Sequence, residues 1–501
     1  MNPDQNRLME ITRREFLTAS LVALSCPYAT ADTGRDSAPF GALPSARQRR
    51  WQRMETNAFL HFTVNTFTDR EWGNGDEDPA VFNPTDFDAD AIVLALKTGG
   101  MQGVILTCKH HDGFCLWPTH TTNHSIRLSS WKNGKGDVVR EIANAASRHG
   151  LGFGVYLSPW DRNSAEYGRP GYIATYRQQL TELLTWYGPI FEVWFDGANG
   201  GSGYYGGSNE TRTIDKHTYY DWPTTWALVR KLQPGATIFS DAGPDVRWVG
   251  NEKGIAGETC WATCDPIAAN GDPAVPGDSQ TDVLNAGTRF GSRWLPAECD
   301  VSIRPGWFWH EREDNQVKTP DQLLDLYFHS VGRGANLLLN IPPNRQGRLS
   351  PQDTQALAEF HRRVQATFAH NLAAEAKLTP SNVREQNPRF GATRLLDGSL
   401  DAYWATDDNV HTPELAVGFG RSVRFDVLRL RETIELGQRI GAFAIDAWQQ
   451  DGWTEIAQAT SIGSCRLIRL SAPIETPRLR LRITESPVCV TLAELGVFLQ
   501  A

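Results

Sequence analysis

The sequence predicts an α/β protein in which a (β/α)8-like barrel is followed by a C-terminal β-sandwich. Between about residues 51 and 370, short apolar strands alternate with helical stretches. This alternation indicates parallel strands, and several such units in about 300 residues are typical of a barrel. After about residue 375, apolar side chains recur with a period of two between turns, which is the pattern of a β-sandwich.

Six barrel strands can be placed from apolar runs, over 58–62, 103–107, 153–157, 191–195, 237–240 and 335–339. Helical stretches over 88–97, 137–149 and 172–187 separate the first four of these strands. We therefore expect a barrel domain over residues 32–370 and a sandwich domain over residues 375–501.

Polar side chains follow four consecutive predicted strands, at the point where each strand ends. They lie in the segments Lys109–Asp112, Ser158–Asp161, Asp196–Gly197 and Ser240–Asp241. Catalytic groups of a β/α barrel lie at the carboxyl ends of its strands. These segments are therefore expected to meet at one site.

The C-terminal part carries alternating strands over 423–430 and 478–483. The segments Asp397–Gly398 and Tyr403–Thr406 resemble the discoidin-like, galactose-binding jelly roll. This resemblance implies a β-sandwich that either binds galactose-type glycans or supports the barrel structurally.

The N-terminus predicts export. The segment Thr12–Leu17 has the twin-arginine pattern, a short apolar run follows, and Ala29–Ala31 offers a cleavage site. We expect residues 1–31 to be a signal peptide and the protein to be periplasmic or secreted. A lipoprotein anchored through Cys26 is the alternative. No later segment is long and apolar enough to suggest a membrane span.

Composition narrows the class of ligand. The net charge of −9 argues against a nucleic-acid partner, which requires a basic surface. The 17 Trp, 22 Phe and 12 Tyr residues suit either carbohydrate binding or a large aromatic core. Seven of the eight cysteines lie after residue 31, an odd number without metal-binding spacing. Cys260 and Cys264 are close enough to pair, but most of the seven are expected to be buried and free.

Asp196 is the first candidate catalytic residue. It ends the apolar strand Phe191–Phe195, and Gly197 follows at once, which allows a ligand to approach closely. A retaining glycosidase needs one ionised carboxylate as nucleophile and one protonated carboxyl as general acid. Asp196 suits the nucleophile; the alternative is that it only caps the next turn.

Two further segments could complete such a site. His110 and His111 could bind zinc, act as a base or hold sugar hydroxyls, and no confirming metal motif is present. Glu252 lies in a predicted loop after the strand 237–240, where burial near an aromatic ring would make it a general acid. The alternative is an ordinary solvated glutamate.

The segment Pro296–His310 combines acids, an arginine and aromatic side chains in a short span. It suits a wall of the substrate site or a structural lid. Within it, Glu298 is the second candidate for the general acid.

Several motifs resemble glycoside hydrolase family 29, the α-L-fucosidases. They are His61–Phe67, Lys109–Phe114, Tyr156–Asp161, Trp194–Ala198 and Ser302–Trp307, spread over roughly residues 50–345. The forms Asn65–Phe67, Phe195–Gly200 and Ser302–Arg304 resemble the branch that prefers α-1,3/1,4-linked fucose.

The resemblance implies roles for individual residues. Asp196 matches the nucleophile and Glu252 the acid/base, with Glu298 as the second choice. The positions expected to contact the sugar are His61, Glu71, Trp72, His110, His111, Tyr156, Trp194, Arg247, Glu298 and Trp307. The implied reaction is release of α-L-fucose from fucosylated oligosaccharides or glycoconjugates, without a metal or organic cofactor.

Three other functions remain open from the sequence. A barrel that lost an acid would be a carbohydrate-binding protein without activity, although Asp196 and a candidate acid are both present. A different exo-glycosidase, such as an α-galactosidase, could use a similar barrel. A metal-dependent hydrolase would need ligands that the sequence does not offer in a known spacing.

Overall fold

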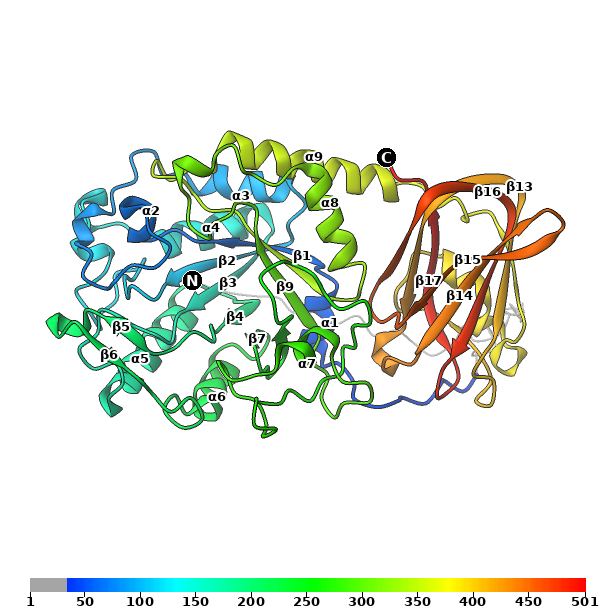
Figure 1. The fold of residues 1–501 in the computed structure, drawn as a ribbon, viewed down its shortest axis with the longest axis horizontal. Coiled ribbons are helices and arrows are strands. Elements are labelled where there is room, and N and C mark those ends of the chain that lie inside the picture. The colour runs from blue at the N-terminus through cyan, green and yellow to red at the C-terminus, as the bar shows by residue number, and fades with distance from the viewer. Residues whose placement is uncertain (1–33) are drawn as a thin grey trace, which may run out of the picture. The chain divides into compact units, whose positions relative to one another are not determined.

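The computed structural model describes residues 34–501, and Asp36–Ala501 form one compact unit (Figure 1). The predicted signal peptide, residues 1–31, lies outside the described residues. Among the described residues, no helix is long and apolar enough to cross a membrane.

Eight strands close into a barrel, in the spatial order β1-β10-β9-β8-β7-β4-β3-β2. Every neighbouring pair is parallel. The strands are β1 (Thr56–Leu60), β2 (Gly103–Lys109), β3 (Gly152–Leu157), β4 (Glu192–Trp194), β7 (Thr237–Ser240), β8 (Val246–Trp248), β9 (Ala297–Ser302) and β10 (Asn336–Asn340). The predicted (β/α)8-like barrel is confirmed.

Nine α-helices accompany the barrel in the part of the chain that the structure describes. They are α1 (Ala46–Gln52), α2 (Val64–Thr68), α3 (Ala89–Thr98), α4 (Val138–His149), α5 (Pro170–Trp186), α6 (Trp222–Leu232), α7 (Thr281–Ala286), α8 (Pro320–His329) and α9 (Pro351–Phe368). The long helix α4 buries its apolar face, and the Asp137 side chain caps its first turn. A small hairpin, β5 (Gly201–Gly203) with β6 (Glu210–Arg212), follows β4.

Two barrel strands were missed in the sequence. The segment around Val246–Trp248 was predicted to be a loop, and Ala297–Ser302 a wall or a lid, but they are β8 and β9. β8 follows β7 after only a short turn, with no helix between them to mark a β/α unit. β9 contains Glu298 and Asp300, and these acids mask the apolar run expected of a buried strand.

The amino-terminal end of the barrel interior is filled by the helix that precedes β1. Trp51 of α1 is 1% exposed and packs with interior residues of the barrel, among them Phe59 and Trp194. Its indole nitrogen donates a hydrogen bond to Glu192 Oε2 at 2.8 Å. The Trp194 indole donates in the same way to Glu298 Oε1 at 2.9 Å. Two buried carboxyl groups therefore lie in the interior below Trp194.

Replacing Glu192 with glutamine is expected to reduce the pH dependence of folding stability. Burial raises the pKa of Glu192 from 4.5 to about 8, and burial with the nearby negative charge of Glu192 raises the pKa of Glu298. Because the unfolded chain releases these protons at lower pH, stability falls as the pH rises from about 4.5 to about 8.

In urea unfolding, Glu192→Gln should be more stable than the wild type at about pH 8, by on the order of 1–3 kcal/mol, and about equal near pH 4. The same difference at both pH values would contradict a buried proton at this position.

The C-terminal part is a seven-stranded antiparallel sheet, as expected for the second domain. Its strands are β11 (Lys377–Pro380), β12 (Trp404–Ala405), β13 (Glu414–Glu432), β14 (Ala442–Gln449), β15 (Gly452–Thr460), β16 (Arg466–Glu485) and β17 (Thr491–Phe498). The long strands β13 and β16 change register twice, and the sheet encloses an apolar core of its own. Leu467 and Phe498 instead join the apolar cluster of the barrel, which supports a structural role for this sheet.

The seven cysteines among the described residues are all buried and free. Cys260 and Cys264 therefore do not form a disulfide. Both pack as small apolar side chains, at 4% and 0% exposure.

Candidate active site

A cavity of about 310 Å³ opens at the carboxyl ends of the barrel strands. About half of the residues in its wall are ones that the sequence predicted to be functional: His61, Trp72, His110, His111, Tyr156, Trp194, Asp196, Glu252 and Trp307. The rest of the wall is Phe59, Gly197, Ala198, Phe239, Asp241, Trp248, Gly277, Ser279, Thr281 and Asp300.

Asp196 is held by two hydrogen bonds that leave its carboxylate facing the cavity. Tyr156 Oη donates to Oδ2 at 2.9 Å, and the Ala198 backbone N–H donates to Oδ1 at 2.7 Å. Tyr156 lies beside Trp194 in the register of β3 and β4, so the barrel itself brings the phenol to the carboxylate. Hydrogen bonds of this kind favour the ionised form, which is the form a nucleophile needs.

Glu252 lies on the loop after β8, at the mouth of the cavity. Glu252 as a whole is an exposed residue, but its carboxyl group faces the cavity. Trp307 Nε1 donates a hydrogen bond to Glu252 Oε2 at 3.4 Å. Partial burial raises the pKa of Glu252, and the negative charges of Asp196 and Glu71 raise it further against the opposing indole hydrogen bond. A carboxyl group with a raised pKa can keep the proton that a general acid donates.

His61 is fixed in one tautomer by Asn340 of β10. The Asn340 amide nitrogen donates to Ser302 Oγ and to the Trp307 carbonyl, so its oxygen, 2.9 Å from His61 Nδ1, must be the acceptor. His61 therefore carries its proton on Nδ1 and keeps a lone pair on Nε2. Burial lowers the pKa of His61 to about 4, so the ring is neutral at pH 7.

His111 is fixed in the same way by Ser158. Ser158 Oγ donates to the Trp160 carbonyl and accepts from His111 Nδ1 at 2.7 Å. Burial lowers the pKa of His111 to about 4, and its Nε2 lies 3.8 Å from Asp196 Oδ2. His61 and His111 are therefore hydrogen-bond acceptors at Nε2, which suits the hydroxyl groups of a sugar.

Comparison with known proteins identifies the family. The family model of the α-L-fucosidases matches residues 42–366. Alpha-L-fucosidase 1 of Arabidopsis thaliana is 43% identical over 465 residues, covering 92% of this chain and 88% of its own. The chain belongs to the α-L-fucosidase family, glycoside hydrolase family 29.

Two solved structures of family 29 each resemble more than nine tenths of this chain. A family 29 member from an unknown rumen bacterium is 41% identical with a TM-score of 0.82, covering 92% of this chain and 78% of its own. A Ruminococcus gnavus family 29 fucosidase, solved in complex with fucose, is 32% identical with a TM-score of 0.84, covering 94% and 98%.

Arg247 does not contact the cavity of the fucosidase, contrary to the expectation from the sequence. Side chains alternate along β8, so Val246 and Trp248 face the barrel interior and Arg247 faces outward. The Arg247 guanidinium is fully buried, where it donates to the Leu284, Leu295 and Trp261 carbonyls. It holds the long segment between β8 and β9 against the barrel.

Glu298 and Glu71 also lie outside the cavity wall. Glu298 is 0% exposed and lies in the interior beneath Trp194, so the structure does not support it as the general acid. Glu71 accepts hydrogen bonds from the backbone N–H groups of Trp307 and Phe308 and lies 2.7 Å from His310 Nε2. Glu71 therefore positions the segment that carries Trp307.

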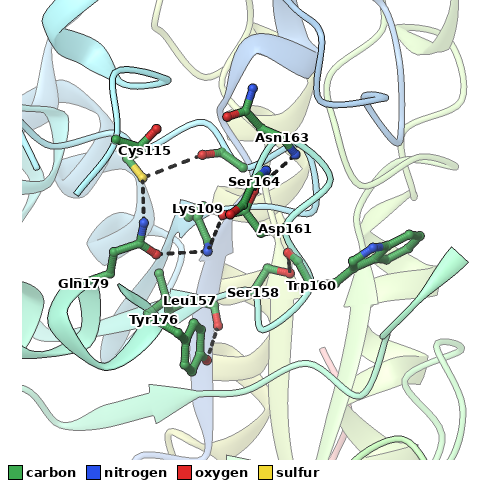
Figure 2. Close-up of polar contacts among 12 residues, drawn as sticks. Lys109, Cys115, Leu157, Ser158, Trp160, Asp161, Asn163, Ser164, Tyr176 and Gln179 are labelled. Atoms are coloured by element: carbon green, nitrogen blue, oxygen red, sulfur yellow. Dashed lines mark hydrogen bonds and ion pairs between the residues drawn. The ribbon is translucent and has the colours of Figure 1, made fainter. Parts of the chain in front are cut away.

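The polar residues that flank the histidines form a buried network rather than part of the cavity. Figure 2 shows Lys109 Nζ between Asp161 and Gln179, at 3.1 and 3.0 Å. Tyr172 Oη completes the coordination of this ammonium at 3.1 Å. The ion pair joins the end of β2 to the segment after β3, and so fixes His111 relative to Ser158.

Asp241, Trp248 and Asp300 also line the cavity. Asp241 was expected at this end of the barrel, without a specific role, whereas Trp248 and Asp300 were not among the predicted site residues. Asp241 accepts hydrogen bonds from Gly277 N–H and Ser279 Oγ, which ties a distant loop to the cavity wall. Trp248 and Asp300 could have been found by counting alternate residues along β8 and β9, had these strands been recognised. Among the described residues, no group of His, Cys, Asp and Glu is arranged to hold a metal ion.

Proposed function

We propose that this fucosidase releases terminal α-L-fucose with retention of configuration, through a covalent intermediate on Asp196. The observation that supports it is the contrast between two carboxyl groups of one cavity. Asp196 accepts hydrogen bonds that stabilise its charge, whereas Glu252 has a raised pKa that favours its protonated form. These are the two roles that a retaining glycosidase requires.

The reaction then has two steps. An Asp196 oxygen bonds to the anomeric carbon as the glycosidic bond breaks, and the Glu252 proton moves to the leaving oxygen. A water molecule next gives a proton to Glu252 and attacks the anomeric carbon, which releases Asp196 and free fucose. Phe59, Trp194 and Phe239 give the cavity an aromatic surface that suits the methyl group of a 6-deoxy sugar.

For the substrate, we infer fucose in α-1,3 or α-1,4 linkage within a branched glycan. The motifs of that branch support this linkage, and so does a second groove that adjoins the cavity. The groove shares Trp72 and Gly197–Ala198 with the cavity and continues along Trp160 and Gly200–Ser202. The Trp72 side chain is 53% exposed there, so it can stack on a neighbouring sugar ring.

A substrate panel with proton NMR tests the reaction and the linkage together. Trisaccharides with α-1,3- and α-1,4-linked fucose should be cleaved at least about tenfold faster than an α-1,2-linked one, and a nitrophenyl α-galactoside should be inert. The first sugar released should be the α-anomer of fucose. Initial release of the β-anomer would exclude the intermediate, and faster cleavage of the α-1,2 linkage would exclude the proposed substrate.

We also propose that the protein is exported by the twin-arginine route, on the basis of the segment Thr12–Leu17. Conversion of Arg13 and Arg14 to lysine should leave the protein in the cytoplasmic fraction of the producing cell. Unchanged fractionation of this variant would exclude that route.

A further inference from the structure

Asp300 is one of four carboxyl residues that line the cavity, together with Asp196, Asp241 and Glu252. It lies two residues after Glu298 on β9, so its side chain also faces the barrel interior, but one layer higher. Whereas Glu298 lies below the cavity, Asp300 forms part of its wall and is only 4% exposed.

The surroundings of Asp300 disfavour a negative charge. One contact opposes this: the Trp248 indole donates a hydrogen bond to Oδ1 at 2.7 Å, which lowers the pKa of Asp300, and among residues 34–501 it is the one side chain that donates to this carboxyl group. Within the same residues, no lysine, arginine or histidine forms an ion pair with Asp300. Burial raises the pKa of Asp300 well above its usual value, and the charges of Glu252 and Asp196 act in the same direction.

Many of the hydrogen-bond donors in the cavity wall are already used within the protein. The indole N–H groups of Trp194, Trp248 and Trp307 and the hydroxyl of Tyr156 all donate to carboxyl groups of the protein. His61 and His111 offer only lone pairs. A sugar hydroxyl both donates and accepts, so its acceptor side needs a donor from the wall.

We propose that Asp300 binds the sugar as a neutral carboxylic acid, with Oδ2–H donating to a ring hydroxyl of the fucose. The Trp248 indole orients the group, because its hydrogen bond to Oδ1 leaves the second oxygen for the ligand. This inference rests on the proposed function and adds a sugar-binding residue to it.

Asp300→Asn and Asp300→Ala distinguish a neutral donor from the alternatives. Asparagine can accept from Trp248 at its oxygen and donate from its amide nitrogen, so kcat/KM for nitrophenyl α-L-fucoside should stay within about threefold of the wild type. Alanine removes the donor, and kcat/KM should fall about 10- to 100-fold. If kcat/KM of the asparagine variant is as low as that of the alanine variant, the charge is required. If kcat/KM of the alanine variant equals that of the wild type, no contact exists. Either result overturns the proposal.

Deoxygenated substrates identify the contact itself. The 2-, 3- and 4-deoxy fucosides should each react more slowly with the wild type, and for one of them this penalty should nearly disappear in Asp300→Ala. Equal penalties in both proteins for all three substrates would overturn the proposal, even if the alanine variant is destabilised. Release of fucose by the wild type in the same assay tests the proposed function separately, so the two failures can be told apart.

Discussion

Replacement of Asp196 with glycine should lower kcat for every fucoside by about 10⁴-fold or more. In the proposed mechanism an Asp196 oxygen bonds to the anomeric carbon, and glycine removes that oxygen. The Tyr156 hydroxyl and Ala198 N–H also lose the acceptor of their hydrogen bonds. External azide should restore part of the activity with an activated fucoside and yield a fucosyl azide of inverted configuration. The wild-type protein should be labelled covalently by a 2-deoxy-2-fluoro fucosyl fluoride, and mass spectrometry should find the label on Asp196.

Glu192→Gln is the matched control for this experiment. Glu192 is the first residue of β4 and lies four residues before Asp196, and its carboxyl group is buried below the cavity. Its replacement should leave kcat close to the wild-type value. Near-normal hydrolysis by Asp196→Gly, or a label on another residue, would rule out the proposed nucleophile.

Replacement of Glu252 with alanine should have the second-largest effect. Glycans with poor leaving groups should be cleaved about 10²- to 10⁴-fold more slowly, because the leaving oxygen no longer receives a proton. Fucosides with a dinitrophenyl leaving group should be affected far less in the first step, and azide should accelerate their turnover.

The pH profile gives an independent measurement for Glu252. The acid must be protonated for the first step, so kcat/KM falls as the pH rises through its pKa. Because the cavity raises this pKa, the fall should occur above the ordinary range of a glutamic acid, and it should be absent in Glu252→Ala. Glu298→Gln is the control and should keep the fall of kcat/KM at high pH. If this fall disappears in Glu298→Gln but not in Glu252→Ala, and azide accelerates Glu298→Gln instead, the assignment of the acid is wrong.

The sequence predicted the barrel strands that carry an apolar run, and helical stretches between the first four of them supported the prediction. The strands β1 to β4 meet this condition, and the residues at their carboxyl ends lie at the cavity or directly beside it. β8 and β9 do not, because one lacks a helix before it and the other holds Glu298 and Asp300 in the barrel interior. A strand whose interior face is acidic cannot be recognised by hydropathy alone.

Errors in the predicted site arose because β8 and β9 were not recognised as strands. Along a strand, neighbouring side chains face opposite sides, so Arg247 could be placed only once the register of Val246 and Trp248 was known. The protonation of His61 and His111 likewise depends on Asn340 and Ser158, which lie far away in the sequence. Their partners are set by barrel closure and not by any local motif.

The indole of Trp51 and the layers above it fill the barrel interior at its amino-terminal end, so the cavity is closed at that end. A glycan chain cannot thread through such a dead end, and only its outermost tip can reach Asp196. In the proposed mechanism, the shortened glycan leaves through the open end before water attacks the intermediate, and fucose leaves last.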